Sequence, residues 1–180
     1  MRIAGSTLVA IMLLTTAGAA LADVPAGSPE QLLSKALQTS MAEVELGKLA
    51  QKKAESTGVN ALGARMQRDH GRIAKVLTAA SRDKGLVVPT SLESSQSAQI
   101  EALRAMSGAE FDAAYVEQMV TNHKQAIVLF TALSESDDRD LSRLASSALP
   151  LLREDQRLAD SYEKLSPVPP IDRVQAVAQK

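Results

Sequence analysis

The segment from Phe111 to Phe130 sets a histidine into an otherwise apolar helical stripe. Residues three or four positions apart share one face of an α-helix. That face carries Phe111, Tyr115, Met119, His123, Ile127 and Phe130, with Val116 and Val120 beside it. The spacing predicts a buried helix whose imidazole needs a polar partner, because an unpaired polar group is costly to bury.

The same M-x-x-x-H spacing occurs once more in the chain, at Met66 and His70, and these are the only two histidines. On that second segment Asp69 and His70 both lie close to the apolar stripe. Either side chain could therefore face the interior of the protein.

Helix-start and helix-stop signals predict four long helices. They cover residues 28–55, 59–84, 107–133 and 139–165, with a short helix over 96–106 inside the connection 86–107. The two starts with a capping-box pattern are at Ser28 and Ser107. Short loops make the first two and the last two long helices hairpins, whereas the long connection 86–107 allows the chain to cross over.

The ends of the chain have a different character from its middle. Residues 1–22 hold an early Arg2, a short apolar run and a small-residue ending, which predicts a cleaved signal peptide. Residues 23–165 are expected to form one helical domain, and the proline-rich residues 166–180 a flexible tail. Export to the periplasm follows, with no later segment apolar enough to cross a membrane.

Composition narrows the class of function. Aromatic residues make up 2% of the chain and cysteine is absent, which favours helices and rules out thiol chemistry. The net charge of −1 gives no long-range attraction for nucleic acid. No nucleophile elbow or phosphate-binding glycine loop is present, so we name no catalytic residue.

Each long helix nevertheless offers one ionisable group near its apolar face. The four are Glu45, His70, His123 and Asp155, with Asp69 as a substitute for His70 and with Tyr115, Met66 and Met119 as neighbours. Glu43 falls outside the predicted stripe. Two imidazoles and two carboxylates suit iron, zinc or manganese, and the two methionines raise copper as a weaker alternative. The other interpretation is a hydrogen-bonded cluster that only sets helix register.

Four segments resemble one family of exported bacterial proteins. They are MAEVELGKLA, MQRDH, SGAEFDAAYVEQMVTNHKQAIVLF and LPLLRED. Together they identify the chain as similar to the domain of unknown function 4142 family, which is placed in the ferritin-like superfamily. The resemblance implies an all-α, up-down four-helix bundle with a long crossover between the second and third long helices, and a Gram-negative periplasm.

The chain departs from the ferritin-like metal pattern. Di-iron members of that superfamily carry E-x-x-H on two helices, but Gln67 and Val120 stand where those glutamates would be. Members of the family it resembles usually have R-E-H on the last helix, where this chain has Asp155 in place of the histidine. We therefore expect a non-enzymatic envelope protein with a structural or stress-related role, for which an envelope partner is one option; the alternative is a metal-binding bundle.

Overall fold

The computed structural model describes residues 27–165, and every regular element in this range is an α-helix. The helices are α1 (Pro29–Lys53), α2 (Thr57–Asp83), α3 (Ser94–Ala105), α4 (Gly108–Ser134) and α5 (Arg139–Leu165). The all-α prediction is confirmed, and each helix boundary lies within a few residues of the predicted one. The expected signal peptide and tail lie outside the described residues.

Local sequence signals account for most of the helix ends. At α1, the Ser28 hydroxyl accepts from the Gln31 amide while the Gln31 side chain accepts from the Ser28 amide, so the predicted capping box is present. At α2, Gly85 adopts φ 67°, a left-handed conformation that favours glycine after a helix. The box predicted at Ser107 is absent, because its side chain makes no capping hydrogen bond.

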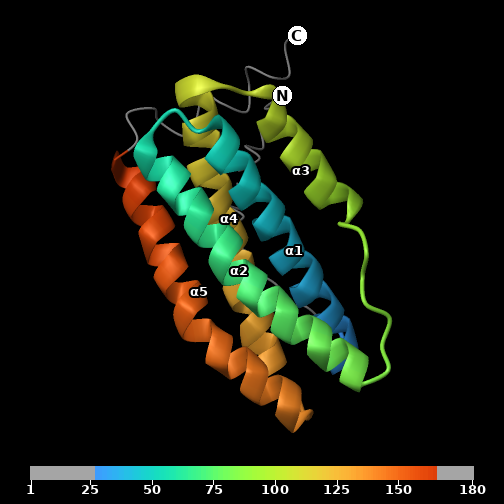
Figure 1. Cartoon of the computed structure of the whole chain (residues 1–180). Helices are drawn as coiled ribbons and strands as arrows, with labels where there is room; N and C mark the ends of the chain where they lie inside the picture. The colour runs from blue at the N-terminus through green and yellow to red at the C-terminus, as the bar shows by residue number, and fades with distance from the viewer. Residues whose placement is uncertain (1–26, 166–180) are drawn as a thin grey trace, which may run out of the picture.

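The five helices form a bundle (Figure 1). In it α1 packs along α2, α4 packs along α5, and α1 also contacts α4. The short α3 lies beside α1, on the side of the bundle away from α5. None of the described helices is long and apolar enough to span a membrane.

Small residues set how closely α1 and α2 approach. A Cβ added to Gly47 would lie 2.6 Å from the Gly63 carbonyl oxygen, and one added to Gly63 would lie 2.6 Å from the Ala50 Cβ. Both distances are shorter than real Cβ contacts, so α1 and α2 can approach this closely only because both positions are glycine. The close packing of α1 on α2 therefore depends on glycines, which hydrophobic periodicity does not detect.

The apolar core consists of two clusters. One lies around Leu46, Met66, Phe111, Tyr115 and Met119, and the other around Leu33, Leu37, Leu77, Phe130 and Leu152. Each of the four long helices supplies residues to both clusters. On each long helix, a buried ionisable residue lies between the residues of one cluster and those of the other.

Candidate metal centre

A polar layer separates the two apolar clusters. Its members are Glu43 on α1, His70 on α2, His123 on α4 and Asp155 on α5, each at most 1% exposed. On every helix the polar residue falls between the residues that belong to one cluster and those that belong to the other. The helices thus bring four ionisable groups to one level of the bundle, although they are far apart in the chain.

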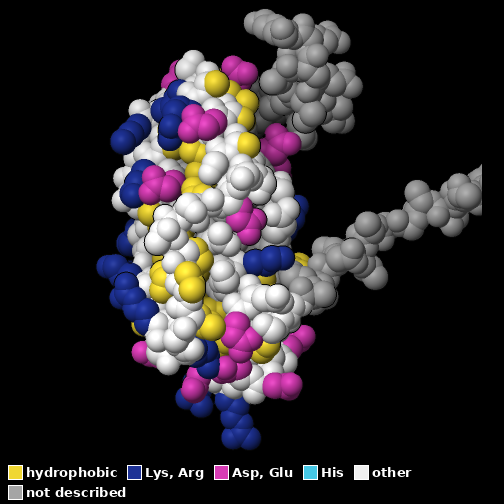
Figure 2. All heavy atoms as spheres, turned by 90° about the vertical axis from the view of Figure 1, so that its right-hand side faces the viewer, with side chains coloured by type: hydrophobic (Ala, Val, Ile, Leu, Met, Phe, Trp, Pro, Cys, Tyr) yellow, Lys and Arg dark blue, Asp and Glu magenta, His cyan; other side chains and the backbone are white. Residues whose placement is uncertain are grey.

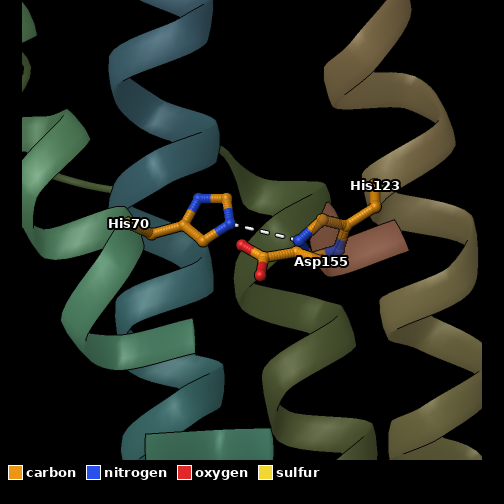
Figure 3. A group of neighbouring side chains, drawn as sticks. All are labelled: His70, His123 and Asp155. Atoms are coloured by element: carbon orange, nitrogen blue, oxygen red, sulfur yellow. Dashed lines mark hydrogen bonds between the residues drawn. The ribbon is translucent and has the colours of Figure 1, made fainter. Parts of the chain in front are cut away.

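The two histidines face each other across this layer. Nε2 of His70 lies 3.2 Å from Nε2 of His123, with the rings 86° apart in plane. Figure 3 shows both rings pointing inward from α2 and α4, with the Asp155 carboxylate beside the space between them. One potential ligand atom from each of the three residues lies within 4.8 Å of the others.

The backbone of α4 determines which nitrogen of His123 faces the cluster. Nδ1 of His123 lies 2.9 Å from the Met119 carbonyl oxygen one turn earlier. A carbonyl only accepts hydrogen bonds, so Nδ1 carries the hydrogen, and a neutral ring then keeps its lone pair on Nε2. The lone pair therefore faces His70 and Asp155. Metal-binding histidines are commonly oriented by such a contact.

Arg65 occupies only one side of Asp155. Its Nε lies 2.6 Å from Asp155 Oδ1, and its Nη2 lies 2.9 Å from Glu154 Oε1 at the surface. The other oxygen, Oδ2 of Asp155, is buried and has no protein partner. One carboxylate oxygen is thus held in place while the other is left free.

Other buried atoms in and next to the layer also lack a protein partner. They are His70 Nδ1 and Glu43 Oε2 in the layer, and the Tyr115 hydroxyl in the adjoining apolar cluster. Unpaired buried polar atoms are uncommon in folded proteins, and they indicate an unseen water, an ion or a functional role. Protein groups alone therefore leave hydrogen-bonding capacity at three of the four residues of the layer, His70, Glu43 and Asp155.

Burial shifts the pKa values of three residues in the layer. Desolvation, followed by the nearby His123, lowers the pKa of His70 to about 3, so this ring is neutral at neutral pH. Desolvation also raises the pKa of Asp155, against the opposing effect of Arg65. The pKa of Glu43 is raised by burial as well, against the effects of His123 and Asn122. A neutral imidazole is the form that binds metal.

Glu45, predicted to face the interior, points to solvent. Its side chain is 48% exposed and pairs with Lys48 at 2.6 Å. Glu43 takes the interior position instead and accepts a hydrogen bond of 2.7 Å from the Asn122 amide. The prediction was wrong by two residues because it aligned the stripe on Met41 and Val44, which lie at the border of the buried face.

A better signal was present in the small residues of α1. Ala36, Ser40, Gly47 and Ala50 are all buried and stand three or four positions apart, with Glu43 in the same row. Small side chains allow the closest helix approach, so they mark the interface better than the larger Met41 and Val44 do. A search for spaced small residues would have found Glu43.

The remaining predicted residues fall into two groups. Asp69 is buried, but its carboxylate faces three arginines: Arg68 Nε at 2.9 Å, Arg65 Nε at 3.6 Å and Arg72 Nη1 at 3.8 Å. It is not part of the histidine group. Tyr115, Met66 and Met119 are all fully buried in the adjoining apolar cluster. Met119 contributes through its backbone carbonyl.

The spacing of the three inner groups suits a metal ion. Two nitrogens bound to one tetrahedral zinc ion at about 2.0–2.1 Å would stand roughly 3.3 Å apart, close to the 3.2 Å between the two Nε2 atoms. Two imidazoles and a carboxylate would leave further coordination positions open. The orphaned Asp155 Oδ2 supplies an acceptor that nothing else in the described structure uses.

Fold and site together define a class: an all-helical bundle with a buried histidine and carboxylate layer. Residues 14–161 match the family described as Domain of unknown function (DUF4142), and the chain belongs to that family. No match was found among curated proteins.

A solved structure resembles most of this chain. It is a crystal structure of a DUF305 fragment from Deinococcus radiodurans, with a TM-score of 0.68 and 15% sequence identity. The similarity covers 78% of this chain and 98% of that one. At this identity the likeness concerns the fold alone.

Proposed function

We propose that this protein is a metal-binding helical bundle of the bacterial envelope, which holds a divalent transition-metal ion between His70, His123 and Asp155. The observation that carries the proposal is the 3.2 Å approach of two buried imidazole nitrogens beside a carboxylate oxygen without a partner. Neutral imidazoles and a carboxylate favour zinc, iron or manganese. Copper is the weaker choice, because methionine sulfur is not among the donors that support the site.

The envelope location and the finer fold belong to the same proposal. The signal-like residues 1–22 support export to the periplasm. Two helix hairpins joined by a long connection support a ferritin-like four-helix bundle with a crossover between α2 and α4. The site would then be a single-ion variant, since neither histidine has the glutamate of an E-x-x-H motif.

A second function, a purely structural polar layer, is favoured by one observation. Arg65 already neutralises Asp155, and a hydrogen on His70 Nε2 would make the imidazole contact a plain hydrogen bond. Such a layer would set the register of the four long helices. Under this function the protein would be a non-enzymatic envelope component with a structural or stress-related role, and it would bind no metal.

Metal reconstitution separates the two functions. The purified protein is stripped with a chelator, dialysed separately against zinc, iron(II), manganese(II) and copper, and analysed for bound metal. We expect a stoichiometric amount of one of these ions in the wild type. Loss of that ion in His70→Ala and in His123→Ala would support the site, and a wild type that retains none of the ions would refute it.

Glu45→Ala is the matched control. It removes a carboxylate from α1, but one that faces solvent and pairs only with Lys48 in the described contacts. The control should bind as much metal as the wild type. Far-UV circular dichroism of each histidine variant shows whether metal is lost from a folded protein.

A further inference from the structure

A pocket of about 250 Å³ opens on the face formed by α1, α3 and α4. Its outer part carries mainly polar side chains, including Lys35, Thr39, Glu93 and Gln99. Its inner part includes Glu43 and Asn122. Figure 2 shows the side of the molecule where α3 lies, and no histidine is visible at this surface. Both histidines are buried, at 1% exposure, and among the residues of their layer it is Glu43 that lines the pocket.

Glu43 has an oxygen free to receive a ligand from this pocket. Oε1 accepts from the Asn122 amide at 2.7 Å, and the Asn122 side-chain oxygen in turn accepts from Gln118 at 2.6 Å. Oε2 is buried without a partner, although the residue lines the pocket and is only 1% exposed. The Asn122 contact holds the carboxylate in place and leaves its second oxygen open.

The same carboxylate is close to the histidine group. His123 and Asp155 both act electrostatically on Glu43, His123 favouring its charged form and Asp155 opposing it. Asn122, which holds Glu43, directly precedes His123 on α4. Glu43 therefore lines the pocket and is also a buried member of the layer that contains His123 and Asp155.

Two larger pockets lack this connection. One, of about 600 Å³, lies near Gly58 and Tyr162, and the other, of about 430 Å³, lies near Met41 and Gly71. Neither is lined by any of the four residues of the polar layer. Volume alone would favour these pockets, but the position of Glu43 favours the smaller one.

We propose that the pocket between α1, α3 and α4 is the entrance to the buried site, and that Glu43 receives a hydrated divalent cation there and passes it to His123, His70 and Asp155. This inference rests on the proposed metal-binding function. Amide and hydroxyl groups in the pocket can hydrogen-bond to the waters of the cation, which carboxylate and imidazole ligands replace as it moves inward.

Obstruction of the entrance is the first test. Cobalt(II) is the probe, because its visible absorption changes when nitrogen ligands replace water, and the rates are followed by stopped flow. Gln99→Trp places a large side chain at the exposed rim on α3. Because a narrowed passage slows both directions equally, association and dissociation should each fall by about tenfold while Kd stays unchanged.

Ser97→Trp is the control for this variant. Ser97 is exposed on the same helix but does not line the pocket. Its association rate should equal that of the wild type. If Gln99→Trp also binds cobalt at the wild-type rate, the ion enters elsewhere and the entrance is refuted.

The role of the carboxylate is tested with Glu43→Gln, which keeps the size of the side chain and an oxygen to accept from Asn122. Removing the charge should slow association by about tenfold or more. Glu45→Gln, the matched change on the exposed side of α1, should leave the rate unchanged. Equal rates in the two variants would refute the role of Glu43, and if Glu43→Gln does not fold, Gln99→Trp still decides the route.

The outcomes separate this inference from the function on which it rests. A wild type that takes up no cobalt or other divalent ion overturns the proposed function, and the entrance with it. A wild type that binds cobalt, with unchanged rates in Gln99→Trp and Glu43→Gln, overturns the entrance alone.

Discussion

The guanidinium of Arg65 on α2 reaches the fully buried carboxylate of Asp155 on α5, with Nε 2.6 Å from Oδ1. Arg65 is itself 24% exposed and also contacts Glu154 at the surface. It therefore links the polar layer with solvent. The contact compensates the cost of burying the carboxylate, and it joins two helices that otherwise touch little.

Replacing Arg65 with methionine should destabilise the protein strongly. Methionine keeps an apolar stem but leaves Asp155 as an unpaired buried charge, which costs about 3 kcal/mol in the free energy of unfolding. Urea unfolding at neutral pH measures the loss. Adding Asp155→Leu to the same protein should recover much of it, because the uncompensated charge is then gone.

Arg104→Met provides the comparison for that change. Arg104 and its partner Glu101 are more than half exposed, so their ion pair should contribute at most about 1 kcal/mol. A loss in Arg65→Met no larger than this would show that the charge of Asp155 does not need the arginine.

The buried His70 should make stability depend on pH. Its pKa is about 3 in the folded protein and about 6.5 in the unfolded chain. Between these values the unfolded chain binds a proton that the folded protein does not, so stability rises with pH. The contribution of His70 to the free energy of unfolding is complete above pH 6.5. It is lost as the pH falls toward 3, by about 1.4 kcal/mol per pH unit.

Glu43 and Asp155 act in the opposite direction. Their pKa values are raised in the folded protein, so their contribution to stability falls as the pH rises above their unfolded values. Comparing the wild type with His70→Leu isolates the histidine, because both proteins keep the two carboxyls. With chelator present, the stability difference from urea unfolding should change between pH 4 and 6, and parallel curves would contradict the prediction.

The contact between α1 and α2 should be sensitive to a single methyl group. In Gly47→Ala the new Cβ would lie 2.6 Å from the Gly63 carbonyl oxygen and 2.7 Å from the Gln67 amide nitrogen. Both neighbours are backbone atoms, so the helices must separate, at a cost of about 2–3 kcal/mol. Thermal unfolding measures this loss.

Gly71→Ala on α2 is the matched control for the methyl group. The Cβ there would have one neighbour, Val44 Cγ2 at 3.9 Å, which is an ordinary contact. Since alanine is the better helix former, this variant should gain about 0.5–1 kcal/mol. A similar loss of stability in both variants would show that the close approach of α1 and α2 at Gly47 is not its cause.

Periodicity was sufficient to predict the helices and three of the four residues in the polar layer. His123 and Asp155 stand inside clear apolar stripes, and His70 repeats the spacing of His123 after a methionine. These residues are buried because the large apolar side chains around them fix which side of each helix faces the core. Asp69 shows the limit of this reasoning, since it is equally buried yet faces arginines.

Glu43 could not be chosen over Glu45 from the large apolar residues of α1. This helix packs against both α2 and α4, so its buried face is wider than one stripe and includes alanine, serine and glycine. Which glutamate faces inward depends on the rotation of α1 about its own axis. Contact with Gly63 on α2 and Asn122 on α4 determines that rotation.

The sequence by itself determined that the chain is helical and where its helices begin and end. It also placed an ionisable residue on the buried face of three of the four long helices, since capping signals and helical periodicity are local properties. The tertiary structure decided that these groups share one level, that Glu43 is the one on α1, and that the two Nε2 atoms approach to 3.2 Å. The relative shift and rotation of four packed helices set those distances, and no local pattern encodes them.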